Sequence, residues 1–354
     1  RRYSCGMLPG NKIEEMTYDA ATSGVSWELS EGRWRFPTAV SGGTPGAVNS
    51  NPQIEEKPED PDENPEGPEE PSVPDEFEPV LPGEIIINEL LPDPYAGGSE
   101  YIELYNRSEH ALSLSALSLA IRKSDGTLST RYPLTSVPHN LKAKGYLLLT
   151  KNLEGVTSFY DIADLSALCE LSKLPILANT SSTLALLRTA DKIVIDEVAY
   201  SSKWHAHSVK NVKGVALERI DPDAATQDEA NWTSASETAG CGTPGYQNSQ
   251  YKNASSGDAT GIEPPVWIEE SGSYTVSYLL DRPGYSCRAF VFNTSGLRVA
   301  EISNHELLGI SGKIIWSGIA NNGSPLQAGI YIFYAEIYHP EGMVKRFKKA
   351  FLIR

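Results

Sequence analysis

Residues 83–106, GEIIINELLPDPYAGGSEYIELYN, constrain the fold more than any other part of the chain. They begin with a β-branched run at residues 85–87, and a loop that contains Pro92 and Pro94 follows. Residues 101–105 then alternate with a period of two, which is typical of a strand with one buried face. The segment therefore predicts two strands joined by a turn-rich loop, in a chain built mainly from β-sheet.

The order of motifs that follows this segment also occurs near the N-terminus, which indicates two related units. The later copy reads IDEVAY at 195–200, GVALER at 214–219, NW at 231–232 and GTPG at 242–245. The earlier copy reads IEEMTY at 13–18, GVSWEL at 24–29, RW at 33–34 and GTPG at 43–46. The earlier copy matches only the end of the later one. We therefore expect residues 1–50 to be the closing third of a domain whose other strands lie outside this sequence.

These motifs resemble the lamin tail domain, an immunoglobulin-like β-sandwich. INEL followed by SEYIELYN is similar to the opening of that family. In its bacterial surface members a D-x-V-x-Y strand, a G-x-S-L-E-R strand, an N-W pair and G-T-P-G-x-x-N close the pattern. The resemblance implies a complete domain over residues 83–250, and a module that holds or presents other molecules.

Two segments separate the predicted domains. Residues 51–82 contain nine prolines and 12 acidic residues against one lysine, and so carry most of the chain's net charge of −16. Such a segment buries too little apolar surface to fold alone, and proline and charge repulsion keep it extended. We predict an acidic spacer, with calcium capture or a basic partner as alternatives. Residues 251–264, rich in Ser, Gly, Asn and Ala, form the second linker.

Residues 265–354 are predicted to form a separate small β domain. Its strand pairs and its W-S-G turn resemble the Ig-like domain of flagellar hook-assembly type at the C-termini of Bacteroidetes surface proteins, with Ser317 in place of the family's Asp. The final strand, residues 343–354, carries Lys345, Arg346, Lys348 and Lys349 in its interior and is predicted to be an edge strand. A basic edge strand either docks onto a receptor or is protected by its charges from aggregation.

One segment favours a helix. In residues 151–175 the apolar side chains of Ile162, Leu165, Leu168 and Leu171 recur with a spacing near 3.6. We predict one short helix inserted between strands of the central domain. The fold class is therefore all-β, with tandem immunoglobulin-like β-sandwiches joined by an acidic proline-rich linker.

Acidic side chains near the first strand pair are the nearest approach to a catalytic pair. They are Glu89, Asp93, Glu100 and Glu103. Strand alternation places Glu100 and Glu103 on opposite faces, whereas a retaining glycosidase needs two carboxyls about 5–5.5 Å apart. We predict hydrogen bonding within the sandwich, no catalytic residue and no enzymatic activity.

His205 and His207 are weak candidates for metal ligands. Their spacing puts both imidazoles on one face of an extended chain, but no Asp, Glu or Cys accompanies them at a recognisable distance. We predict that they are structural or exposed loop residues.

The GTPG motifs lack the lysine and helix that a phosphate-binding loop requires, so they predict tight turns and no cofactor.

Composition limits the partners. The acidic balance argues against a nucleic-acid partner, and no apolar run approaches the roughly 18 residues of a transmembrane segment. A small-molecule ligand is not expected.

Cys169 and Cys241 are the only cysteines in the same predicted domain, so they are the one pair that could form a disulfide in an oxidising periplasm.

We therefore expect a non-catalytic interaction or scaffold protein, exported through the periplasm to the outer-membrane surface or secreted, with protein partners there. The resemblance of the C-terminal domain narrows this to a component or cargo of type IX secretion. The alternative is the accessory C-terminal region of a larger secreted hydrolase, nuclease- or phosphatase-like, whose catalytic domain lies upstream. A carbohydrate-binding module is a third hypothesis.

Overall fold

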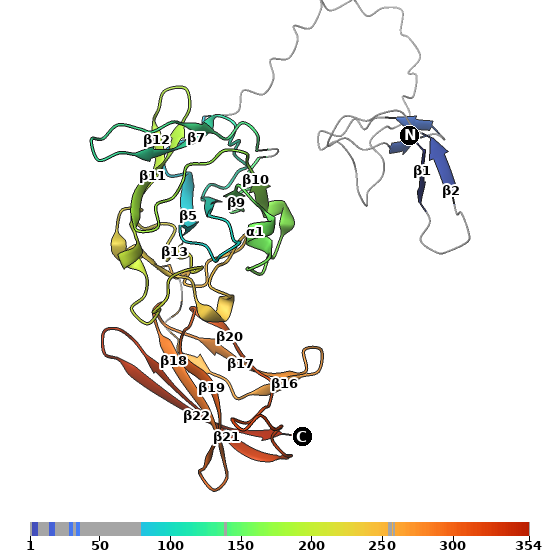
Figure 1. Ribbon diagram of the computed structural model, residues 1–354, viewed down its shortest axis with the longest axis vertical. Helices are drawn as coiled ribbons and strands as arrows, with labels where there is room; N and C mark the ends of the chain where they lie inside the picture. The colour runs from blue at the N-terminus through green and yellow to red at the C-terminus, as the bar shows by residue number, and fades with distance from the viewer. Residues whose placement is uncertain are drawn as a thin grey trace, which may run out of the picture. The chain divides into compact units, whose positions relative to one another are not determined.

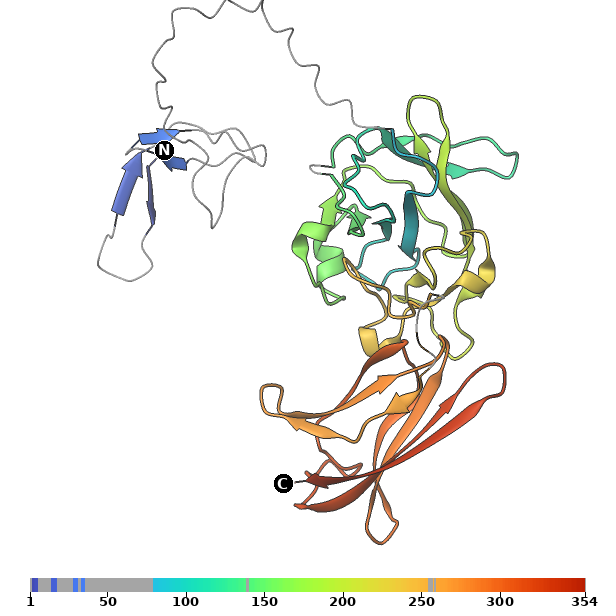
Figure 2. The same cartoon turned by 180° about the vertical axis from the view of Figure 1, so that it is seen from behind.

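The computed structural model describes residues 2–5, 14–17, 28–30, 33–35, 79–137, 140–253, 257 and 259–353. The chain divides into two compact units, Arg1–Pro74 and Asp75–Arg354. Figures 1 and 2 show both units from opposite sides. The predicted acidic linker lies outside the described residues as far as residue 78, so its conformation stays a prediction.

The described part of the first unit consists of two antiparallel strand pairs. They are β1 (Arg2–Cys5) with β2 (Glu14–Thr17), and β3 (Glu28–Ser30) with β4 (Arg33–Arg35). The expectation of β-strands in residues 1–50 is confirmed at these positions. A wider sheet completed by other strands falls outside the described residues and stays a prediction.

Two sheets form the first β-domain of the second unit. The larger sheet has the order β10-β9-β6-β5-β13-β14, and the smaller has the order β12-β11-β7-β8. Leu104 and Leu147 of the larger sheet share one apolar core with Leu119 and Leu186 of the smaller. This arrangement confirms the predicted all-β sandwich. The larger sheet comprises β5 (Ile85–Leu91), β6 (Tyr101–Asn106), β9 (Tyr146–Thr150), β10 (Leu168–Glu170), β13 (Leu217–Arg219) and β14 (Trp232–Ser234), and the smaller β7 (Leu117–Arg122), β8 (Tyr132–Pro133), β11 (Ser181–Arg188) and β12 (Val194–Ser201).

A short helix, α1 (Glu154–Thr157), lies between β9 and β10, but not where the apolar spacing predicted it. The predicted helical face is wrong. Asp164 caps the 3₁₀ turn η1 (Leu165–Ala167), and Leu168 then starts β10, which pairs in parallel with β9. Leu165 is 72% exposed whereas Leu171 is buried, so these leucines do not share one face. Pairing at the sheet edge outweighs the local helical pattern.

The remaining helical turns of the second unit are short. They are η2 (Ser202–Trp204), η3 (Glu229–Asn231) and η4 (Glu237–Ala239). No helix in the described residues has the length and hydropathy needed to cross a membrane.

The C-terminal β-domain has its own apolar core between two further sheets. One sheet is centred on β17, and the other has the order β19-β18-β21-β22, which places β22 at an edge as predicted. Gly261 and Ile262, which we assigned to the linker, form β15 beside β17, and Ile262 is buried in this core. The strands are β15 (Gly261–Ile262), β16 (Val266–Ile268), β17 (Ser273–Leu279), β18 (Ser286–Asn293), β19 (Arg298–Leu307), β20 (Ser311–Trp316), β21 (Gly329–Tyr338) and β22 (Val344–Ile353).

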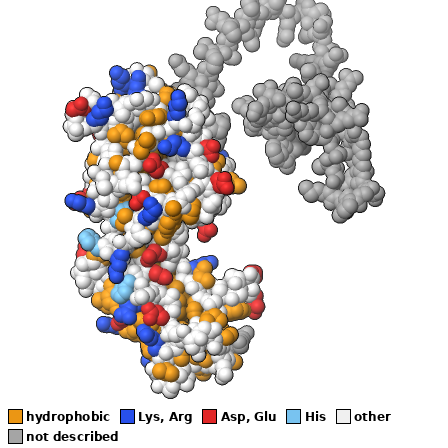
Figure 3. Space-filling view, in the orientation of Figure 1, with side chains coloured by type: hydrophobic (Ala, Val, Ile, Leu, Met, Phe, Trp, Pro, Cys, Tyr) orange, Lys and Arg blue, Asp and Glu red, His pale blue; other side chains and the backbone are white. Residues whose placement is uncertain are grey.

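Within the second unit, hydrogen bonds join the two β-domains. Ile310 N donates to Ser249 O at 2.8 Å, and Gln250 Nε2 donates to Leu308 O at 3.0 Å. The surface of this unit mixes hydrophobic, acidic and basic side chains in the view of Figure 3. The residues just before 251 therefore belong to the first β-domain and also contact the second.

Candidate functional site

Three glutamates lie side by side on the larger sheet of the first β-domain. Glu103 of β6 pairs with Glu89 of β5, and Glu89 pairs with Glu218 of β13. Directly opposed residues on neighbouring strands point to the same face. These three residues, the glutamate row, have no solvent exposure.

A β-bulge brings Glu89 into this row. Ile87 pairs with Leu104 and Glu89 with Glu103, so Asn88 has no directly opposed residue. An extra residue in one strand changes the phase of its side-chain alternation. The Asn88 amide consequently lies on the same side as Glu89 and donates to Glu103 Oε1 at 3.0 Å.

The closing loop, residues 242–250, covers the glutamate row and donates hydrogen bonds to all three carboxyls. Thr243 N donates to Glu89 Oε1 at 3.0 Å, and Gly245 N donates to Glu103 Oε2 at 2.7 Å. Gln250 N donates to Glu218 Oε2 at 2.9 Å. The GTPG motif therefore does donate hydrogen bonds to carboxyl groups, but they belong to the protein itself.

Two glycines allow the loop to approach so closely. A Cβ at Gly242 would lie 2.7 Å from the Tyr101 hydroxyl and 2.9 Å from the Tyr160 ring. Gly245 has a φ of +84°, and a Cβ there would lie 3.0 Å from Ala167. Both positions exclude larger side chains.

The row must hold at least one proton. Thr243 Oγ1 lies 2.6 Å from Glu89 Oε2 and 3.0 Å from Glu218 Oε1. A hydroxyl has one hydrogen to donate, so one of these two contacts needs a protonated carboxyl as its donor. Burial and the neighbouring Glu89 raise the pKa of Glu218 to about 8. Burial, with the charge of Glu89, also raises the pKa of Glu103 well above its ordinary value.

The opposite face of β13 carries a buried ion pair. Leu217 and Arg219 point away from Glu218, because side chains alternate along a strand. Arg219 Nη2 lies 3.0 Å from Asp196 Oδ2 of the smaller sheet, and its guanidinium lies 5.0 Å from the Trp232 ring centroid. The L-E-R motif thus places one residue in the core, one under the closing loop and one between the sheets.

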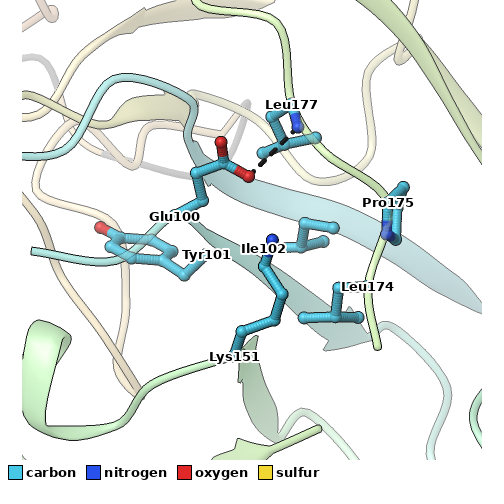
Figure 4. A pocket seen from close by; sticks show the side chains of 7 residues that line it. All are labelled: Glu100, Tyr101, Ile102, Lys151, Leu174, Pro175 and Leu177. Atoms are coloured by element: carbon cyan, nitrogen blue, oxygen red, sulfur yellow. Dashed lines mark hydrogen bonds between the residues drawn. The ribbon is translucent and has the colours of Figure 1, made fainter. Parts of the chain in front are cut away.

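Glu100 lies apart from the row, as strand alternation predicts. Its Oε2 accepts a hydrogen bond from Leu177 N at 3.2 Å, and Lys151 and Ile102 lie beside it (Figure 4). Burial raises the pKa of its carboxyl. The cavity at this place has a volume of about 10 Å³, which is room for one water molecule and no larger ligand.

The two candidate metal ligands have different surroundings. His205 is partly buried, with Nδ1 2.8 Å from Ser234 Oγ, and burial lowers its pKa to about 4. His207 is exposed. In the residues that the structure describes, no cluster of three or more His, Cys, Asp or Glu is placed to hold a metal ion.

The disulfide considered for Cys169 and Cys241 is not present, and both thiols are free. Cys169 lies in the core between the two sheets. Cys241 lies on the other side of the larger sheet, near Tyr95, at the start of the closing loop. The sheet separates the two thiols, so the one pair that could have formed a disulfide is not bridged.

Sequence reasoning considered Glu89 and Glu103 but missed Glu218 and the row as a whole. The internal repeat contained a signal for it. Glu28 and Gly43-Thr44-Pro45-Gly46 of the earlier copy correspond to Glu218 and Gly242-Thr243-Pro244-Gly245 of the later one. A glutamate and a GTPG motif that recur together predict contact between them.

Residues 81–202 match the family model of the Lamin Tail Domain. This match bears out the resemblance for the central part of the chain. No curated protein matches the sequence.

Solved structures give weak likenesses. The dimeric latent PorU from Porphyromonas gingivalis has a TM-score of 0.22 at 15% identity, over 80% of this chain and 21% of that one. PorZ, a surface component of the type-IX secretion system of Porphyromonas gingivalis, has a TM-score of 0.21 at 11% identity, over 75% of this chain and 30% of that one. This chain thus covers less than a third of either structure. Scores this low carry no argument about fold or function.

Proposed function

We propose that the chain is a non-catalytic interaction or scaffold part of a secreted or cell-surface protein. This proposal rests on the structural role of the glutamate row. All three carboxyls are fully buried and accept hydrogen bonds from the closing loop. A general acid or nucleophile must reach a substrate, whereas these groups hold the sandwich closed.

The match of residues 81–202 to the Lamin Tail Domain supports the same conclusion. A β-sandwich of this kind is a rigid scaffold that presents its loops and edges to partners. The partner and its location are inferred from the C-terminal β-domain.

The docking surface that we propose is the edge strand β22. Lys345 pairs with Asp281 and Arg346 pairs with Glu336. Lys348 and Lys349 have no ion-pair partner within the described part of the chain. A ten-residue edge strand offers backbone N–H and C=O groups for strand addition, and its free cations attract an acidic partner. We infer a protein partner at the outer membrane of a Bacteroidetes cell, in a component or cargo of type IX secretion.

The test is a double substitution, Lys348→Glu with Lys349→Glu, in the full chain expressed in a bacterium with a type IX system. We expect the amount on the cell surface, measured by protease accessibility, to fall about tenfold because the cationic edge no longer attracts its partner. The matched control is Lys313→Glu with Lys210→Glu, which changes the net charge equally away from β22. Equal surface amounts for both double variants would refute docking through β22.

A further inference from the structure

A groove of about 640 Å³ opens on the C-terminal β-domain where an edge strand of each sheet lines it. These strands are β16 of one sheet and the end of β22 of the other. The apolar side chains of Val266, Trp267 and Leu352 line the groove and are exposed. The volume is within the range of clefts that bind ligands, and it is large enough for several residues of an extended peptide.

Trp267 is the outermost member of an aromatic row across three strands. Trp267 pairs with Tyr274, and Tyr274 pairs with Trp316, so the three rings lie on one face of the sheet. The Trp267 and Tyr274 centroids are 5.1 Å apart, and those of Tyr274 and Trp316 are 5.3 Å apart. Tyr274 and Trp316 are buried, but Trp267 is 41% exposed. Trp267 is therefore the ring of this row that a ligand in the groove would contact.

The groove has an acidic lining. Glu269 directly follows β16 and is the charged side chain that lines the groove in the described part of the chain. It is exposed, and its carboxylate forms no hydrogen bond or ion pair with another described residue. The surrounding segment, residues 263–270, reads EPPVWIEE and contains neither lysine nor arginine. A charged ligand at this place should therefore be a cation.

The cations of β22 lie farther along that strand. Lys348 is four residues before Leu352, which lines the groove. Lys349 is four residues before Ile353, which also lines it. A strand rises about 3.3 Å per residue, so the Cα atoms of each pair are about 13 Å apart. This distance exceeds the Debye length of about 8 Å at physiological ionic strength, so Glu269 dominates the charge at the groove.

We propose that the groove binds an extended, cationic and apolar segment of another polypeptide, which adds to β16 as a further strand. Within the described residues β16 pairs with β17 alone, so its other edge offers backbone N–H and C=O groups. Pairing of this kind supplies affinity, and the side chains along the edge supply specificity.

An arginine gives the segment its specificity. Trp267 and Glu269 are two residues apart and both line the groove, so one long side chain can reach both. The planar guanidinium of an arginine stacks on an aromatic ring and also pairs with a carboxylate. Apolar residues beside the arginine would pack against Val266 and Leu352.

The lining favours a peptide over a carbohydrate. Its exposed polar side chains, within the described residues, are those of Glu269 and Ser317. A sugar has many hydroxyl groups that would remain without partners between aliphatic walls. The site is separate from the β22 docking surface and prefers the opposite charge, so the inference goes beyond the function proposed above.

The experiment titrates a fluorescein-labelled peptide, GTVRVTG, with the full chain and follows fluorescence anisotropy. The matched control peptide has citrulline, a neutral group of the same shape, in place of arginine. We expect saturable binding of the arginine peptide that weakens at high salt. The citrulline peptide should bind about threefold more weakly, because it does not pair with the carboxylate.

Three variants of the full chain locate the binding site. Trp267→Ala should weaken binding about tenfold, because the stacking surface is lost. Glu269→Gln should weaken the arginine peptide about threefold and leave the citrulline peptide unchanged, because the coupling needs both charges. Glu270→Gln removes the same charge outside the groove lining, so it is the control and should leave both affinities unchanged. Circular dichroism checks that each variant is folded.

Arg354 follows the groove-lining Ile353 in the sequence, and its charge would compete with that of the peptide. The titrations are therefore repeated with Arg354→Gln. The proposal is overturned if neither chain binds the arginine peptide, if the citrulline peptide binds equally well, or if Glu270→Gln weakens binding as much as Glu269→Gln does.

Two further measurements separate this site from other binding modes. Displacement of the peptide by cellohexaose would assign the groove to a carbohydrate and overturn the proposal. Normal peptide binding by the variant with Lys348→Glu and Lys349→Glu would support it, because that variant is expected to lose docking through β22. A failure of the groove and a failure of the docking surface are thus distinguishable.

Discussion

The two β-domains of the second unit each align three similar side chains across three neighbouring strands, and they treat them in opposite ways. The glutamate row of the first domain is covered completely by the closing loop. The aromatic row of the C-terminal domain runs from a buried tryptophan to one that is 41% exposed. The pairing register of the strands produces both rows. The chemistry of the side chains decides whether a row is covered by a loop or reaches the solvent.

The difference follows from solvation. A carboxyl removed from water must find donors or keep a proton, so a row of buried glutamates requires a loop with several N–H and O–H groups. An aromatic ring has no such requirement, because an edge position costs it only part of its apolar burial. The first row therefore closes a fold, and the second leaves a surface for binding.

The aromatic row gives the largest expected effect on stability. Trp316→Ala should lower the free energy of unfolding of the C-terminal domain by about 4 kcal/mol, because it removes a buried ring and leaves a cavity. Trp267→Ala should lower the same free energy by only about 1 kcal/mol, because that ring is already partly exposed to solvent. Urea unfolding followed by circular dichroism measures both. Equal losses would show that the row is buried to the same depth at both ends.

The closing loop gives the next effect. Thr243→Val keeps the shape of the side chain but removes the hydroxyl between Glu89 and Glu218. We therefore expect it to lower the free energy of unfolding by about 2 kcal/mol. The same substitution at Thr275, a half-buried position on β17, should cost about 0.5 kcal/mol or less. Comparing the two variants by thermal unfolding tests whether a threonine hydroxyl stabilises the fold only where it forms a hydrogen bond with a buried carboxyl.

The glutamate row should also make the stability of the protein depend on pH. The pKa of Glu218 is raised from 4.5 to about 8 in the folded state, so folding is favoured while its carboxyl is protonated. The stabilisation is complete below about pH 4.5 and is lost as the pH rises towards 8. Glu218→Gln should flatten this decline, and Glu270→Gln, on an exposed turn, should leave it unchanged.

Melting temperatures measured between pH 5 and pH 9 check this expectation. A wild-type stability that rises over this interval, or a Glu218→Gln variant with an unchanged slope, would contradict the assignment of the raised pKa.

Local pattern predicted much of the fold because period-two alternation depends on residues near in sequence. The strands at 85–91 and 101–106, and the opposite orientations of Glu100 and Glu103, follow from it. The same reasoning failed at residues 159–174. There a spacing near 3.6 came from a loop, a 3₁₀ turn and a short parallel strand rather than from one helix.

The candidate site was less predictable because its contacts join distant residues. Thr243 and Glu89 are 154 positions apart, and the bulge at Asn88 changes the phase of β5 without any glycine or proline to mark it. The sequence contains such a signal only for Glu218, because a glutamate and a GTPG motif recur together in the two copies. Long-range pairing of this kind depends on which groups need donors, and single-strand periodicity does not contain that information.

The closing loop also has a mechanical consequence. Ser249 and Gln250 hold Glu218 of β13 in the larger sheet through the Ser249 hydroxyl and the Gln250 N–H. The same two residues hold the C-terminal domain through Ser249 O and Gln250 Nε2. Tension applied to the C-terminal domain therefore passes through these two residues to Glu218 on β13 of the larger sheet. A partner that pulls on the C-terminal domain would pull directly on the group that keeps the first domain shut.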